Sequence, residues 1–231
     1  MLKPMATRSA EFMRDWFADD YSSINASANG SFFERYTHAA MEPPWSHGMA
    51  FPNVLEVGAN RGEHIPYVHH EFHRYIASDI EPPQLLAEVA ADPRIEPLAC
   101  DIAALPARDQ TFDRVVVTCV LHHVESPYDA AFELRRVTRV GGLLTILVPN
   151  DPGAAYRWGK ALTTGRYARK SGRSRQSALA DAIGHHNHYR SIRIQLREAF
   201  RDDAVSVRWL PFRVPAVELN AFTVWNIRRL S

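Results

Sequence analysis

The chain has 231 residues, a formal net charge of +1 and 46% hydrophobic residues. This length predicts one sizeable α/β domain, and the near-zero charge excludes a global field that attracts nucleic acid. No run of 18 apolar residues occurs, so we expect no transmembrane span. The first eight residues lack the apolar core of a signal peptide, and Cys100 and Cys119 form no metal-binding pair. We therefore expect reduced thiols and a cytoplasmic location.

Residues 1–52 precede the first predicted strand. Phe12, Met13 and Trp16 recur at helical spacing and predict an amphipathic helix over residues 9–20. A second helix is predicted over residues 31–41.

Residues 53–150 follow the order β-α-β-α-β-β-α-β. Their strands are continuous apolar runs rich in β-branched residues, as in a parallel sheet covered on both faces. We expect strands over residues 54–57, 74–79, 95–100, 112–120 and 141–149. We expect helices near residues 63–72, 82–91 and 127–140, with Gly141 ending the third.

The first strand ends in a tight turn that contains Gly58, Asn60 and Gly62. Glycine lets the backbone pass close to a ligand, and asparagine tolerates a left-handed φ. The expected helix start that follows offers unpaired N–H groups to a carboxylate or phosphate. The turn is not a dinucleotide fingerprint, because the third glycine of that motif would fall at Glu63.

Two acids follow the next strands at suitable distances. Asp79 ends the second strand, 21 residues after Gly58, where a carboxylate can accept both hydroxyls of a ribose. Asp101 ends the third strand and precedes Ile102. The carboxyl ends of parallel strands form one edge of a sheet, which is where open α/β sheets bind ligands.

The turn and the two acids resemble the motifs of class I S-adenosylmethionine-dependent methyltransferases, with Asn60 in place of the middle glycine. This resemblance implies a seven-stranded, doubly wound, mostly parallel sheet that ends in a hairpin of residues 205–210 and 222–227. It also implies that helices of residues 1–52 cover the cofactor. The cofactor would be S-adenosylmethionine. Its binding residues would be Glu56, Gly58, Ala59, Asn60, Gly62, Asp79, Ile80, Asp101, Ile102 and Thr118.

The resemblance gives each group of residues a part of the cofactor. The turn would shape the methionyl end, and a β-branched residue at Gly62 would fill space that the ligand needs. Glu56 would bind the ammonium group, or else be a strand residue that pairs with a local amide. Asp79 would bind the ribose, Asp101 the adenine amino group, and the N–H of Ile102 a ring nitrogen.

Histidines supply the candidates for a general base, because imidazole accepts protons near neutral pH. His123 follows the fourth strand, and His188 follows a basic segment; we select these two as catalytic residues, with packing as the alternative role of His123. His185, His186 and His188 also raise the question of a metal. No acid lies between Asp181 and Glu198 to complete such a set, so we expect no metal site.

Residues 151–190 are expected to be an insertion between the fifth strand and a helix at residues 191–200. Seven cations fall within 19 of its residues, with no acid among them. Three interpretations remain open: a solvated loop, a lid over a phosphorylated or nucleotide-linked acceptor, and a contact with an anionic membrane surface or tRNA. Aromatic residues for base stacking are few here, which weakens the RNA interpretation and favours a partner other than nucleic acid.

The predicted function is methyl transfer to a small molecule, with O-methylation of a sugar or natural-product intermediate as the specific reaction. The run at residues 148–157 is similar to methyltransferases among bacterial sugar and surface-polysaccharide enzymes. C-methylation of the ubiquinone or menaquinone type is the main alternative. A methyltransferase-like protein that binds the cofactor without catalysis is the other. The whole chain is expected to be one domain, divided into residues 1–52, 53–150, 151–190 and 191–231.

Overall fold

The computed structural model describes residues 7–16, 32–42 and 47–231. Its centre is a seven-stranded sheet with the order β3-β2-β1-β4-β5-β7-β6. β7 is antiparallel to β5 and β6, and all other neighbours are parallel. The predicted doubly wound, mostly parallel sheet is thereby confirmed. In chain order, β1 to β7 span Asn53–Val57, Arg74–Asp79, Ile95–Ala99, Phe112–Thr118, Thr138–Pro149, Ala204–Leu210 and Phe222–Arg228.

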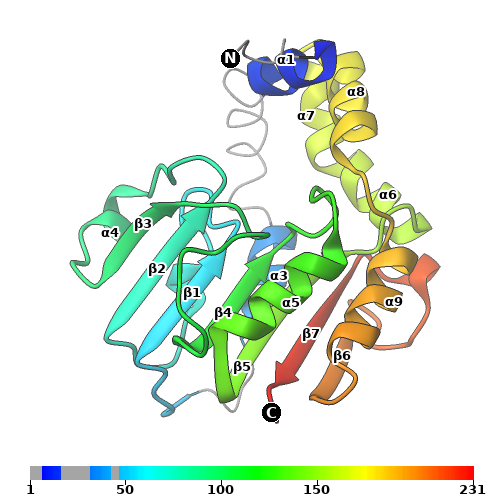
Figure 1. The fold of residues 1–231 in the computed structure, drawn as a ribbon. Coiled ribbons are helices and arrows are strands. Elements are labelled where there is room, and N and C mark those ends of the chain that lie inside the picture. The colour runs from blue at the N-terminus through cyan, green and yellow to red at the C-terminus, as the bar shows by residue number, and fades with distance from the viewer. Residues whose placement is uncertain (1–6, 17–31, 43–46) are drawn as a thin grey trace.

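Helices lie on both faces of this sheet, as the continuous apolar strands require. Helices α5 (Pro127–Val137) and α9 (Tyr189–Ala199) cover one face, and α3 (Phe32–Met41) lies against the other (Figure 1). Side chains of β4 alternate between the two layers: Val115 and Val117 join the core under α5 and α9, whereas Val116 packs with Met41. The sheet is therefore buried on both faces.

Helix α5 begins and ends for local reasons. The Ser126 side chain accepts a hydrogen bond from the N–H of Asp129, and Pro127 occupies the first helical position, where a missing N–H costs little. The helix ends at Val137 because Thr138 is extended and already pairs with Phe112 in the sheet. The prediction of a helix to residue 140 was wrong at this end, and Gly141 lies inside β5 with φ +78°.

Two other predicted helices are largely absent. Residues 63–72 contain only a short 3₁₀ turn, Ile65–Tyr67 (η3). Pro66 would be the fourth residue of the predicted helix, where its N–H should donate to the carbonyl of Gly62, and proline has none. Residues 82–91 contain only α4 (Ala87–Ala90), because the residue before each of Pro82 and Pro83 is disfavoured in the α region.

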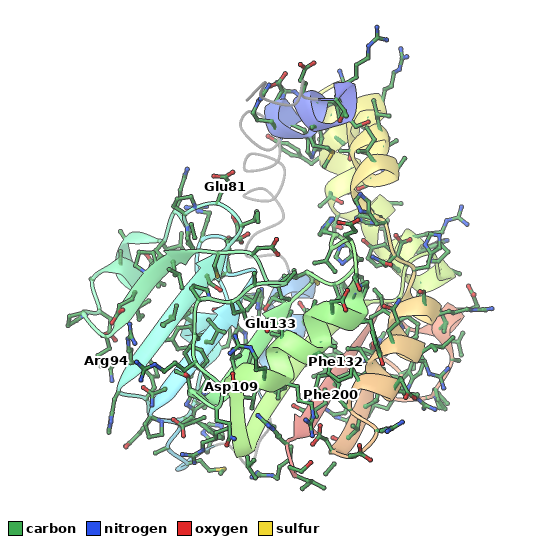
Figure 2. All side chains as sticks on the ribbon, in the orientation of Figure 1. Glu81, Arg94, Asp109, Phe132, Glu133 and Phe200 are labelled. Carbon is green, nitrogen blue, oxygen red and sulfur yellow. The ribbon has the colours of Figure 1, made fainter. Side chains whose placement is uncertain are left out.

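The loop between β3 and β4 is fastened to α5. Glu133 of α5 accepts a hydrogen bond from the N–H of Leu105 at 2.9 Å, and Arg136 binds Asp109 at 2.7 Å (Figure 2). The loop that begins with Asp101 is thus held at its far end by a helix of the core.

The basic segment forms helices rather than a solvated loop. Helices α6 (Ala154–Leu162), α7 (Thr164–Lys170) and α8 (Ser174–Gly184) follow β5. In Figure 1, α7 and α8 extend past the carboxyl ends of β1 and β4, together with α1 (Arg8–Asp15), which is the described part of the helix predicted over residues 9–20. Trp16 and Met13 pack against Ala180 of α8. The N-terminal helix therefore packs on the insertion.

A charged group lies in the middle of the sheet. Arg114 of β4 is fully buried, and its guanidinium donates to both carboxylate oxygens of Glu42, just after α3, at 2.8 and 2.5 Å. His64, beyond the glycine turn, contacts the same carboxylate at 3.0 Å and His38 of α3 at 3.4 Å. Burial acts to raise the pKa of Glu42, but the hydrogen bonds from His64 and Arg114 hold it well below its usual range.

We predict that Glu42→Gln destabilises the protein by about 3–5 kcal/mol, because it leaves the buried Arg114 cation uncompensated. Urea unfolding measures this as a lower midpoint at unchanged slope. Glu96→Gln is the matched control, because Glu96 pairs with Arg74 at the surface and such a pair contributes at most about 1 kcal/mol. The depressed pKa also fixes the direction of the pH dependence. The stability that Glu42 contributes is present above its unfolded pKa of about 4.5 and is lost as pH falls. Equal losses in the two variants would contradict the buried pair.

Candidate active site

The turn after β1 adopts the backbone that its residues predict. Gly58, Asn60 and Gly62 all have positive φ, at 79°, 47° and 78°. The N–H groups of Gly58 and Ala59 both donate to the carbonyl of Ser78 in β2 at 2.9 Å. The turn is thus fixed to the carboxyl end of β2, directly beside Asp79.

The glycines of the turn are required by protein packing. A Cβ on Gly58 would lie 2.2 Å from Cγ2 of Val120, and one on Gly62 would lie 3.0 Å from Cγ1 of Val89. Leu85 and Ile65 also surround Gly62. The expectation that a side chain at Gly62 would occupy ligand space is therefore corrected: it would first meet apolar side chains of the chain itself.

The carboxylate of Asp79 is aimed at the turn. Its Oδ2 accepts from the N–H of Asn60 at 2.9 Å, and its Oδ1 accepts from the N–H of Ile80 at 2.8 Å. A carboxylate has about four acceptor positions, so about two remain for the two hydroxyls of a ribose. The neighbouring Ile80 is 67% exposed, an apolar side chain free to pack on a flat ring. These residues fit the nucleoside of S-adenosylmethionine.

Asp101 lies on an exposed bend after β3. Its Oδ1 accepts a hydrogen bond from the N–H of Ala103 at 2.9 Å. This bond leaves Oδ2 available to accept from a ligand. The Ile102 side chain is buried at 5% exposure, which anchors the backbone next to the acid. A carboxylate and a backbone N–H thus lie side by side at Asp101 and Ile102. Their binding of adenine, which the resemblance implies, remains a proposal.

Glu56 differs from the other predicted cofactor residues because its side chain is buried at 1% exposure. Its Oε2 accepts a hydrogen bond from the Tyr75 hydroxyl at 2.8 Å, and burial raises the pKa of Glu56 to about 7. Glu56 is thus paired within the fold, but with a hydroxyl from the neighbouring strand β2, whereas the sequence suggested a local amide. A role toward the cofactor ammonium remains a proposal, as does that of Thr118, which ends β4 with its carbonyl close to Gly58.

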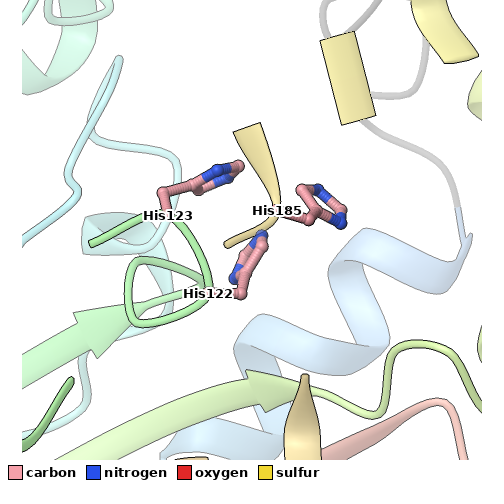
Figure 3. A group of neighbouring side chains, drawn as sticks. All are labelled: His122, His123 and His185. Atoms are coloured by element: carbon pink, nitrogen blue, oxygen red, sulfur yellow. The ribbon is translucent and has the colours of Figure 1, made fainter. Parts of the chain in front are cut away.

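Three histidines meet beyond the carboxyl end of β4 (Figure 3). His122 and His123 follow the strand, and His185 follows α8. The ring centroids are 3.9 Å apart for His122 and His123, 4.6 Å for His122 and His185, and 5.1 Å for His123 and His185. His188, the other predicted base, is exposed at the start of α9 and lies outside this group.

Two of these imidazoles have a defined tautomer. The Nδ1 of His123 bonds the carbonyl of Gly184 at 2.8 Å, and the Nδ1 of His185 bonds Oδ2 of Asp151 at 2.7 Å. A carbonyl and a carboxylate only accept, so both Nδ1 atoms carry the proton and the neutral rings present the Nε2 lone pair. His185 and Asp151 were not selected from the sequence. One signal could have identified Asp151. It follows β5, and β5 lies beside β4, which leads into His122.

Desolvation sets the protonation of two of the rings. Burial lowers the pKa of His122 well below its usual range. His123 is exposed at the surface, yet the protein around its ring lowers the pKa of His123 by desolvation to about 4, against the opposing hydrogen bond to Gly184. Both imidazoles are neutral at pH 7. His123 can therefore accept a proton at Nε2.

The charge of the basic segment is partly neutralised in the fold. Lys160 pairs with Asp181 of α8 at 2.5 Å. Arg169 donates a hydrogen bond to the carbonyl of Ala161 and keeps its charge. The exposed cations on α7 are Arg166, Arg169 and Lys170. Arg157 and Arg175 of the same segment are exposed as well, so several of its cations can attract an anion.

The fold and the turn with its acids define a class I S-adenosylmethionine-dependent methyltransferase. A family model described as "Methyltransferase domain" matches residues 55–146, which contain the glycine turn and both acids. The chain is accordingly an S-adenosylmethionine-dependent methyltransferase, and S-adenosylmethionine is its cofactor. No curated protein matches the sequence.

Solved structures with similar folds share little sequence with this chain. A Haloferax volcanii protein in complex with the Trm112 methyltransferase activator has a TM-score of 0.64 and 15% identity, covering 98% of this chain and 100% of its own. The Burkholderia thailandensis 1,6-didemethyltoxoflavin-N1-methyltransferase has a TM-score of 0.63 and 19% identity, and the match covers 100% of this chain and 94% of that protein. The [4+2]-cyclase SpnF has a TM-score of 0.58 and 14% identity, and the match covers 85% of this chain and 80% of that protein. At these identities the likeness shows the fold alone.

We predict that Asp79→Ala weakens S-adenosylhomocysteine binding by about 100-fold or more, because two charge-assisted hydrogen bonds of at least about 1.5 kcal/mol each are lost. Calorimetric titration gives the affinity. Glu88→Ala, which removes an exposed carboxylate of α4, should bind like the wild type. Wild-type affinity in Asp79→Ala would end the ribose assignment.

Proposed function

We propose that this methyltransferase methylates a hydroxyl oxygen of a small, anionic acceptor, such as a phosphorylated or nucleotide-linked sugar or natural-product intermediate. The observation that carries the proposal is the neutral His123 imidazole beyond β4, whose Nδ1 is engaged by Gly184 so that Nε2 presents a lone pair. An alcohol loses its proton on methylation, whereas several other acceptors do not need a base. The proposal includes a cytoplasmic location, which the free thiols of Cys100 and Cys119 support. In the described part of the chain, no helix has the length and apolar character to cross a membrane.

Each group of residues has a separate task in this reaction. When bound, S-adenosylmethionine supplies a methyl group activated by its sulfonium. The turn at Gly58 and the carboxylates of Asp79 and Asp101 hold the cofactor, so that alignment of the acceptor behind the methyl carbon becomes the main contribution of the protein. His123 Nε2 takes the hydroxyl proton as the new C–O bond forms. A base with a pKa near 4 favours proton transfer that is concerted with methyl transfer over prior deprotonation.

His188 remains the second candidate base from the sequence. His188 is the N-cap residue of α9 and is exposed, as His123 is, but in the described part of the chain no hydrogen bond of its side chain orients the ring. Geometry therefore favours His123, since positioning precedes pKa in selecting a base.

We predict that His123→Ala lowers kcat by about 10²–10⁴-fold, the usual contribution of a general base, and that His188→Ala lowers it less than about tenfold. Cofactor affinity should stay at the wild-type value in both. Because desolvation lowers the pKa of His123 to about 4, the wild-type rate should remain constant as pH falls through 6.5 and decline only near pH 4. A decline centred near 6.5 with a fully active His123→Ala enzyme would place the base elsewhere.

The exposed cations of α7 support an anionic acceptor. Arg166, Arg169 and Lys170 lie on a helix that is carried by the same insertion as His185, and no cofactor residue lies on that helix. Such a patch attracts phosphate without reading the rest of the molecule. The remaining acceptor groups would be recognised elsewhere.

We predict that changing Arg166, Arg169 and Lys170 together to Ala raises the acceptor KM and leaves cofactor affinity unchanged, and that added salt weakens wild-type acceptor binding by screening. The assay is methyl transfer from labelled cofactor to phosphorylated sugars, their unphosphorylated forms and quinol precursors. Arg190, Arg193 and Arg197 of α9 changed to Ala form the control, with the same loss of charge on another helix. Transfer to quinol carbon would favour C-methylation, and no transfer to any acceptor would favour a cofactor-binding protein. An acceptor KM unaffected by the α7 changes would contradict a role of these cations in binding an anionic acceptor.

A further inference from the structure

Three ring nitrogens converge where the sequence predicted no metal. One nitrogen each of His122, His123 and His185 lies within 4.8 Å of the other two. Figure 3 shows the rings gathered around one space between the end of β4 and the segment that follows α8. We propose that these three histidines form a binding site for one divalent transition-metal ion of the zinc type.

The second observation is an unsatisfied atom in the same cluster. His122 is only 5% exposed, and its Nδ1 is buried without a hydrogen-bond partner in the described part of the chain. Buried polar atoms are normally paired, and a bound cation is one way to satisfy such an atom. The unpaired nitrogen belongs to one of the three clustered rings, so both observations indicate a ligand at this place.

The other two rings are held in the manner of metal ligands. His123 and His185 each donate Nδ1–H to an acceptor, Gly184 O and Asp151 respectively, which leaves Nε2 for an ion. A metal-binding histidine almost always gives its other N–H to a carbonyl or carboxylate, which fixes the ring and raises its basicity. Asp151 supplies the acid that is missing from the sequence around His185, since it lies 34 residues earlier in the chain.

Backbone hydrogen bonds fix the two segments of the site to each other. The N–H groups of His186 and Asn187 both donate to the carbonyl of His122, at 2.9 and 3.2 Å, and the Asn187 side chain donates to the carbonyl of Val124 at 2.7 Å. Tyr189 N–H donates to the carbonyl of Asp151 at 3.0 Å. The histidine-bearing segments are thus held together by the fold, without an ion.

Distance and charge both suit a small cation. Zinc binds imidazole nitrogen at about 2.0–2.1 Å, which places tetrahedral ligands about 3.3 Å apart. The three nitrogens lie within 4.8 Å of one another, so each N···N distance would have to shorten by about 1.5 Å at most. Neutral imidazoles bring no charge, Asp151 and Asp181 bring two negative charges, and Lys160 brings one positive charge that is paired with Asp181. Three imidazoles favour zinc, nickel, cobalt or copper over magnesium and calcium.

The metal site is independent of the proposed methyl acceptor but shares His123 with the proposed base. An ion on His123 Nε2 would engage the lone pair that the base needs, so the metal-bound and base-competent states exclude each other. Binding is therefore tested without any methyl-transfer assay, and failure of one proposal leaves the other standing.

The test uses the full chain carrying no histidine tag, stripped with a chelator and titrated with Zn²⁺ against a chromogenic chelator. Co²⁺ loading followed by visible absorption reports tetrahedral geometry. The expected result is one ion per chain with intense d–d bands. His185→Ala should weaken binding by at least about 100-fold, Asp151→Asn by about 10–100-fold through loss of its support to the ring. His188→Ala, an exposed histidine of the same segment, should bind like the wild type.

Two results would overturn the site. Wild-type protein that binds no ion stoichiometrically would exclude it, and equal binding by His185→Ala would assign the ion to surface histidines. Unfolding midpoints of the metal-free variants separate loss of a ligand from loss of the fold, and Asp151→Asn, which keeps the shape of the side chain, tests the site where His185→Ala does not fold.

Discussion

The structure depends on the compensation of one buried charge. Arg114 lies in the central strand β4 with no exposure, and an arginine there cannot be neutralised by losing its proton. Its carboxylate comes from Glu42 at the end of α3, and His64 contacts the same carboxylate from the segment beyond the glycine turn. Removing one partner of such a pair destabilises the fold by much more than the net stabilisation that the pair gives, because the other charge stays buried. The fold must therefore hold α3, β4 and this segment together.

The same constraint bears on the active edge of the sheet. His64 lies two residues after Gly62, and Glu56, beneath the turn, is buried beside Tyr75. Buried polar side chains therefore adjoin the turn, whose N–H at Asn60 donates to the carboxylate of Asp79. The cofactor site that we propose lies next to this enclosed polar layer.

A different arrangement holds the acceptor side. Asp151 after β5, His122 and His123 after β4, and His185 after α8 come from three segments that meet only because β4 and β5 are adjacent in the sheet. Hydrogen bonds to Asp151 and Gly184 set the tautomers, and so decide which nitrogen of each neutral ring carries the lone pair. The insertion thereby supplies one imidazole of the cluster, the partners that orient two of its rings, and the exposed cations of α7.

The sequence by itself determined the sheet, the glycine turn and the two acids, because these follow from apolar runs, backbone freedom and spacing along one chain segment. It overstated the helices after β1 and β2, where Pro66, Pro82 and Pro83 outweigh the apolar pattern. It could not pair Glu42 with Arg114 or Asp151 with His185, which are 72 and 34 residues apart. Only tertiary structure decided these contacts, because burial and strand order, rather than spacing along the chain, determine which charges and imidazoles share a site.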